Sequence, residues 1–176
     1  MSFFQSLFGS RAASGTQNSS PSVSPDYVQQ SINLLAERVA DFKDKTSLSY
    51  ALILPALQQL GVRLLVQAQG IEFTKKHYSS MIRTLQEGPN GIRLSIFDNF
   101  NNPEIPADEL QHHIELNTLL WKSVNELTAR GYDLESISHA CFTLATEAAT
   151  KALDGLYAMG IIVACYRELE AGKYDS

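Results

Sequence analysis

The sequence predicts an all-α protein, a bundle of four to six helices with a long C-terminal helix. Two patterns indicate this fold class. Large apolar and small residues recur every three or four positions from Leu134 to Ala171, which is the period of a helix rather than of a strand. Residues 48–87 are strongly apolar with the same period, and the one segment that alternates apolar and polar residues, 92–97, has no evident partner strand.

The chain of 176 residues is long enough for one domain with a hydrophobic core, and a change in composition places the domain boundary near residue 24. Residues 1–24 combine a short apolar segment with a linker rich in Ser, Gly and Ala, whereas residues 25–176 carry the helical patterns. We therefore predict a flexible N-terminal segment, 1–24, followed by a helical bundle domain, 25–176.

Four large apolar residues of the N-terminal segment, Phe3, Phe4, Leu7 and Phe8, would share one face of a helix. A flexible tether with such a cluster is typical of a peptide that docks into a groove on a partner protein or on a second copy. Two other interpretations stay open. The segment packs on its own domain, or residues 1–8 make a shallow contact with a membrane.

Start and stop signals divide the first half of the domain. A helix over about 25–43 has Pro25 in its first turn, a position that proline favours. The next helix begins after a cap at Thr46 or Ser47 and contains Pro55. Because proline lacks a backbone donor and clashes with the preceding turn, we expect a kink or a break near residues 51–54.

The sequence leaves open whether residues 56–87 form one helix or two, because Gly70 interrupts the apolar pattern. The Gly-Pro-Asn-Gly run at 88–91 stops this region, and we expect 88–105 to be an ordered loop that lies on the helices. A further helix, over about 106–130, has a broad apolar face. Its members are Leu110, Ile114, Leu120, Trp121, Val124 and Leu127.

The C-terminal helix, 134–171, would be about 57 Å long at about 1.5 Å per residue. A compact chain of this length is only roughly 40 Å across. The helix therefore bends at its glycines, Gly155 and Gly160, or the molecule is elongated, or a second copy covers the overhang.

Small residues on the C-terminal helix would let another helix approach closely. Within the chain, the helix that contains Trp121 is the expected neighbour, because a tight turn joins the two. The same small residues are the predicted contacts of a homo-oligomer. They are Ala145, Ala148, Ala152 and Gly155.

The net charge of −5 argues against a nucleic-acid-binding surface, which is normally basic. Asp133 and Glu135, at the start of the C-terminal helix, would also repel DNA phosphates. Cys141 and Cys165 are about 36 Å apart on one continuous helix, too far to form a disulfide, so we expect buried thiols. Together with an N-terminus unlike a secretion signal, this favours a reducing, cytoplasmic location.

One cluster offers candidate metal chemistry. Glu109 and His112 have the Glu-x-x-His spacing of carboxylate-rich metal sites in four-helix bundles, and His139 is a third candidate ligand. Such sites normally contain this pair twice, with two further glutamates, and the chain has it once. We therefore predict no metal and no cofactor, and keep these residues as the basis of an alternative.

The leading functional hypothesis is a non-catalytic intracellular interaction or assembly protein. It would bind itself, and another protein, through helical surfaces and the N-terminal apolar peptide. The alternative is a helical-bundle metal- or ligand-binding protein, an enzyme or a sensor, that uses Glu109, His112 and His139. Affinity for nucleic acid is not expected.

Overall fold

The computed structural model describes residues 23–87 and 92–175, and this part of the chain contains six α-helices, one 3₁₀ turn and no strand. The predicted all-α bundle is thereby confirmed. The helices are α2 (Pro25–Thr46), α3 (Tyr50–Gln69), α4 (Ile71–Glu87), α5 (Leu110–Ala129), α6 (Leu134–Ala152) and α7 (Gly155–Glu170). The 3₁₀ turn, η1, is Leu94–Phe97.

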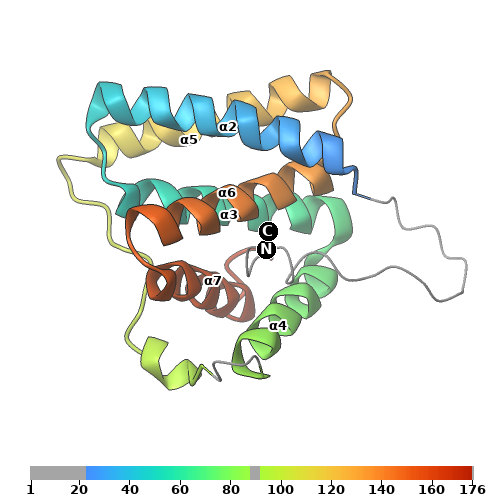
Figure 1. Cartoon of the computed structure of the whole chain (residues 1–176), viewed down its shortest axis with the longest axis vertical. Coiled ribbons are helices and arrows are strands. Elements are labelled where there is room, and N and C mark those ends of the chain that lie inside the picture. Colours follow the sequence, from blue (N-terminus) through green and yellow to red (C-terminus); the bar gives the residue numbers. More distant parts are fainter. Residues whose placement is uncertain (1–22, 88–91, 176) are drawn as a thin grey trace, which may run out of the picture.

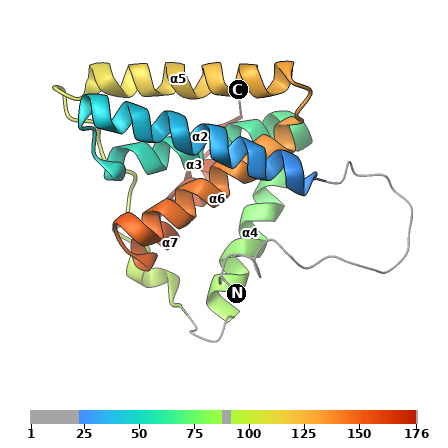
Figure 2. The ribbon, with the colours of Figure 1, turned by 45° about the horizontal axis from the view of Figure 1, so that its top comes forward.

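The helices form three layers (Figures 1 and 2). The pair α2 and α5 covers one side of a central pair, α3 and α6, and the pair α4 and α7 covers the other. Because each central helix is covered from both sides, α3 is buried along most of its length. By length and composition α3 is also apolar enough to cross a membrane, but 67% of the relevant stretch is buried inside the bundle.

Helix α3 runs through Pro55 without interruption, so of the kink or break expected near 51–54, the break does not occur. The helix begins at Tyr50, where the Ser49 hydroxyl accepts a hydrogen bond from the Ala51 N–H at 3.2 Å. Pro55 cannot donate to the carbonyl of Ala51, four residues earlier. That carbonyl instead accepts a hydrogen bond from the Tyr157 hydroxyl of α7 at 3.1 Å, so the fold itself supplies the missing donor.

Residues 56–87 form two helices, which answers the question that the sequence left open. Gly70 lies between α3 and α4 with φ of 85°, a backbone conformation that residues other than glycine rarely adopt. Its N–H donates to the carbonyl of Val66 at 2.8 Å and so completes the last turn of α3. The chain changes direction here and passes from the central layer, which contains α3, into the outer layer that α4 forms with α7 (Figure 1).

The predicted single helix over 134–171 is wrong, because α6 ends at Ala152 and α7 begins at Gly155. The side chain of Asp154 accepts a hydrogen bond from the Tyr157 N–H at 2.6 Å and caps the new helix. The two helices fold back on each other as a hairpin (Figure 1). Within the described residues there is thus no single long helix that overhangs the bundle.

The closest packing of α6 is against α3, not against α5 as predicted. Gly61 of α3 is the contact point: a Cβ atom there would lie 2.5 Å from the ring of Phe142 and 3.2 Å from Cβ of Cys141. The Ser138 hydroxyl donates to the Gly61 carbonyl at 2.7 Å. Helix α6 therefore has a close neighbour, as predicted, but that neighbour is α3, the other helix of the central layer, and not α5.

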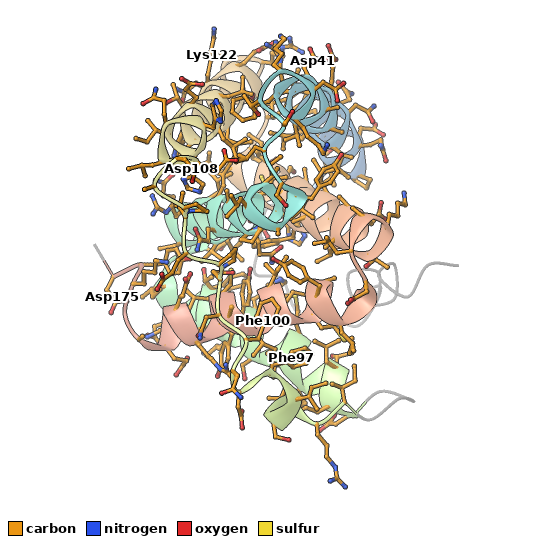
Figure 3. All side chains as sticks on the ribbon, turned by 90° about the vertical axis from the view of Figure 1, so that its left-hand side faces the viewer. Asp41, Phe97, Phe100, Asp108, Lys122 and Asp175 are labelled. Atoms are coloured by element: carbon orange, nitrogen blue, oxygen red, sulfur yellow. The ribbon has the colours of Figure 1, made fainter. Side chains whose placement is uncertain are left out.

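Residues 92–105 lie on the helices, as predicted for the loop 88–105, of which residues 88–91 are outside the described residues. Phe97 of η1 is buried, and Phe100 packs on α7, where its ring would lie 2.6 Å from a Cβ atom at Gly160 (Figure 3). Arg167 of α7 donates to the Phe97 carbonyl at 2.7 Å. Helix α5 itself begins at Leu110, later than predicted, after a turn at residues 107–109.

Candidate functional site

The predicted partner contacts of the C-terminal helix have different environments. Ala145 is buried in the core, with 1% of its surface exposed, and Ala148 is half-buried. Ala152 is exposed at the end of α6, and a Cβ atom at Gly155 would meet no atom within 4 Å. Of these four predicted contacts, only Ala152 and Gly155, at the tip of the α6–α7 hairpin, are thus open to a second molecule. Phe3, Phe4, Leu7 and Phe8 lie outside the described residues.

The candidate metal ligands do not converge. His112 pairs with Glu109 on α5, with Nδ1 and Oε2 3.1 Å apart, whereas the ring of His139 on α6 contacts His77 of α4. Within residues 23–87 and 92–175 no three His, Cys, Asp or Glu side chains are grouped to hold a metal ion. The site on which the alternative function depends is therefore not formed by these three residues.

The structure instead brings together two histidines that are far apart in the sequence. The rings of His77 and His139 meet edge to face with centroids 5.8 Å apart, and Phe142 stacks on His77 at 6.4 Å. The Nε2 atom of His77 is buried without a hydrogen-bond partner among the described residues. Burial, and secondarily the nearby His139, lowers the pKa of His77 to about 4. The pKa of His139 is lowered as well, so this half-buried pair is neutral at pH 7.

Glu168 of α7 is the centre of a polar network. Its carboxylate accepts hydrogen bonds from Gln59 of α3, Asn102 of the loop, and Lys173 and Tyr174 of the C-terminal turn. Partial burial alone would raise the pKa of this carboxyl group, but the donated hydrogen bonds outweigh it and lower the pKa. Because these donors come from α3, the loop and the C-terminal turn, the network fastens residues 173 and 174 to the bundle.

The buried thiols are also structural. Cys141 and Cys165 are both free and fully buried, as predicted, although they lie on separate helices. Burial raises the pKa of Cys141 to about 12, and that of Cys165 is raised as well. Since the thiolate is the reactive form, neither sulfur is prepared for nucleophilic chemistry.

The outer side of α5 is the best candidate for a binding surface. Its broad apolar face is in fact two faces. Leu120, Val124 and Leu127 are buried against the bundle, whereas Leu110 is 49% and Ile114 52% exposed. Leu110, Ile114 and Trp121 follow one another on one side of the helix. At about 100° per residue, this line is about 95° away from the buried line.

Two hollows both include Trp121 in their linings, and we call them together the Trp121 groove. One, of about 570 Å³, runs along α5 and is lined by Ile114, Asn117, Thr118, Trp121, Lys122 and Asn125. The other, of about 220 Å³, lies between α3, α5 and the C-terminal turn and is lined by Arg63, Val66, Gln67, Trp121, Lys173 and Tyr174. Figure 3 shows Lys122 projecting from α5 at the top of the molecule.

Sequence reasoning missed the groove because it assigned all the apolar residues of α5 to one core-facing side. The signal was present in the spacing: residues 110, 114 and 121 form a second helical line beside 116, 120, 124 and 127. The spacing along α5 could not predict that Arg63 and Lys173 line the groove, because the fold brings them beside Trp121 from distant parts of the chain.

Comparisons with protein-family models, with curated proteins and with solved structures find no match to this chain. The functional interpretation therefore depends on the arrangement of its own side chains.

Proposed function

We propose that this protein is a non-catalytic interaction protein of the cytoplasm that binds a partner protein on the Trp121 groove. One observation carries the proposal: α5 is apolar on a second side that faces away from the bundle, with Ile114 52% exposed and Trp121 partly exposed beside it. Aromatic residues flanked by exposed aliphatic residues are the usual anchors of protein interfaces.

The groove also suits a partner in its dimensions. The part lined by residues 114–125 extends over about three turns of α5, or about 16 Å. An amphipathic helix that lies in such a groove inserts side chains at intervals of three or four residues, so a partner segment of about ten residues would fill it.

A substitution on the groove tests the proposal. Ile114→Glu places a charge on the exposed apolar line, and Ile96→Glu on η1, where the side chain is 58% exposed, is the matched control. We expect affinity capture from the native cell, followed by mass spectrometry, to recover a protein with the wild-type chain and with Ile96→Glu. Recovery with Ile114→Glu should fall at least about tenfold, which corresponds to about 1.4 kcal/mol of binding free energy.

Equal recovery with Ile114→Glu and with Ile96→Glu would refute the Trp121 groove as the binding surface. Both substitutions are at exposed positions, so we expect the folded state of each variant to differ from the wild type by no more than about 0.5 kcal/mol. Circular dichroism during thermal unfolding checks that condition.

Self-association is a second proposal, and a separate observation supports it. At the tip of the α6–α7 hairpin, Leu153 and Leu156 are 41% and 55% exposed next to the exposed Ala152. Two large apolar residues beside a small one form a compact surface on which a second copy can pack. The N-terminal residues Phe3, Phe4, Leu7 and Phe8 are a further proposed contact in the same assembly.

A further inference from the structure

The Trp121 groove differs in charge from the protein as a whole. The chain carries a net charge of −5. The two hollows of the groove are nevertheless lined by three cationic residues, Arg63, Lys122 and Lys173, and by no aspartate or glutamate. The residues that line the two hollows therefore carry a positive formal charge, of which Lys173 is balanced by Glu168 outside the lining.

Two of these cations have no carboxylate as an ion-pair partner in the described part of the chain. Lys173 is engaged, because its Nζ donates to Glu168 at 2.6 Å. The side chains of Arg63 and Lys122 take part in none of the ion pairs between described residues. A guanidinium group presents a planar fork of N–H donors that matches a carboxylate, so Arg63 is equipped to bind one.

The rest of the lining explains what else the ligand must carry. Trp121 belongs to both hollows, and Ile114 lies in the longer one. Apolar groups of a ligand can pack against the Ile114 side chain and stack on the face of the Trp121 ring. The complementary ligand thus has large apolar groups on one side and a carboxylate within reach of Arg63.

We propose that the Trp121 groove binds an acidic amphipathic segment of a partner protein, with apolar side chains on Ile114 and Trp121 and an Asp or Glu carboxylate on Arg63. This inference rests on the proposed function and names the chemistry of the partner. The first ten residues of the chain, MSFFQSLFGS, contain no acidic residue, so the protein's own apolar peptide does not supply the carboxylate.

The test uses the full chain and a display library of random peptides of about 16 residues, enough for roughly four helical turns. Trp121 is the single tryptophan of the chain, so its fluorescence reports on the groove without a label. We expect selected peptides to combine Asp or Glu with large apolar residues and to shift that fluorescence. Their affinity should fall as salt concentration rises, because exposed charges are screened.

Charge reversal separates the two parts of the inference. Arg63→Glu should weaken the selected peptides about tenfold or more, since it removes a charge-assisted hydrogen bond and adds repulsion. Arg83→Glu changes the charge by the same amount at an exposed position on α4 and should leave affinity unchanged. Trp121→Ala should abolish binding, measured by fluorescence anisotropy of a labelled peptide.

The outcomes distinguish failure of this inference from failure of the proposed function. Peptides that need Trp121 but bind Arg63→Glu as well as wild type would overturn the acidic partner and leave the interaction surface standing. Peptides that are indifferent to both Trp121→Ala and Arg63→Glu would overturn both, as would a library without binders. A Trp121 shift with vesicles of phosphatidylserine and phosphatidylcholine, and none with peptides, would replace the protein partner with a membrane.

Discussion

At the scale of single residues, the fold holds His77 in its neutral form. The ring packs against His139, Phe142 and Tyr78, and its Nε2 atom is buried without a hydrogen-bond partner among the described residues. Burial is the main cause of the lowered pKa, and a positive charge on His139 would lower it further. Burial also lowers the pKa of His139, and the nearby carboxylates of Glu135 and Asp133 only partly oppose this.

This arrangement predicts a loss of stability in acid. The pKa of His77 falls from 6.5 in the unfolded chain to about 4 in the fold, so the unfolded state binds more protons between these values. Its contribution to the free energy of unfolding is complete above pH 6.5 and is lost as pH falls toward 4. The total is at most about 3–4 kcal/mol, because the pKa falls from 6.5 to about 4 and each pKa unit corresponds to about 1.36 kcal/mol. Urea unfolding at a series of pH values measures it.

A His77→Phe variant provides the comparison. Phenylalanine keeps an aromatic ring in the site and has no titratable nitrogen, so its free energy of unfolding should decline less between pH 6.5 and 4. Parallel pH profiles for His77→Phe and the wild type would contradict the prediction. The sequence could not indicate this pair, because 62 residues separate the two histidines and only the α4–α6 contact joins them.

At the scale of helices, the crossing of α3 and α6 depends on the absence of a side chain at Gly61. The ring of Phe142 fills the space that a Cβ atom would need, and Phe142 is itself buried. Gly61→Ala should therefore destabilise the protein by about 1–3 kcal/mol, the usual cost of overpacking a core. Thermal unfolding measures the change.

Gly155→Ala is the matched control for this substitution. Gly155 is also a helical glycine, but a Cβ atom there meets nothing within 4 Å, so alanine should be neutral or stabilising by up to about 1 kcal/mol. If Gly61→Ala proved as well tolerated as Gly155→Ala, the close crossing would not be what positions α6 on α3.

The helices were predictable where local signals decide them, and less so where packing does. Pro25 and Gly70 mark real boundaries. The break at Leu153–Asp154 was missed because apolar residues continue at helical spacing on both sides of it. The local signal was Asp154 followed by Gly155, an N-cap within the apolar run. The choice of α3 over α5 as the neighbour of α6 depends on Gly61 and Phe142, which lie far apart in sequence.

At the scale of the whole molecule, the three layers change the argument for self-association. A continuous helix over 134–171 would have extended beyond a compact monomer, and that excess length suggested a second copy. Since α6 and α7 fold back as a hairpin, the length is accommodated within one chain. Self-association now rests on the exposed side chains at the hairpin tip, Leu153 and Leu156, rather than on the length of a helix.

The exposed leucines at the hairpin tip predict that the protein self-associates and that one substitution there prevents it. Light scattering after gel filtration should show a multiple of the 19.5 kDa monomer at micromolar concentration, and Leu156→Lys should return it to the monomer. A lysine there places a charge in the apolar contact, whereas Lys76→Leu, on an exposed part of α4, should leave the mass unchanged.

Deleting residues 2–20 tests the N-terminal contact separately: a monomer in that variant alone would assign the assembly to Phe3, Phe4, Leu7 and Phe8. A wild-type monomer would remove self-association from the proposed function, and the Trp121 groove would remain as the surface for a different protein.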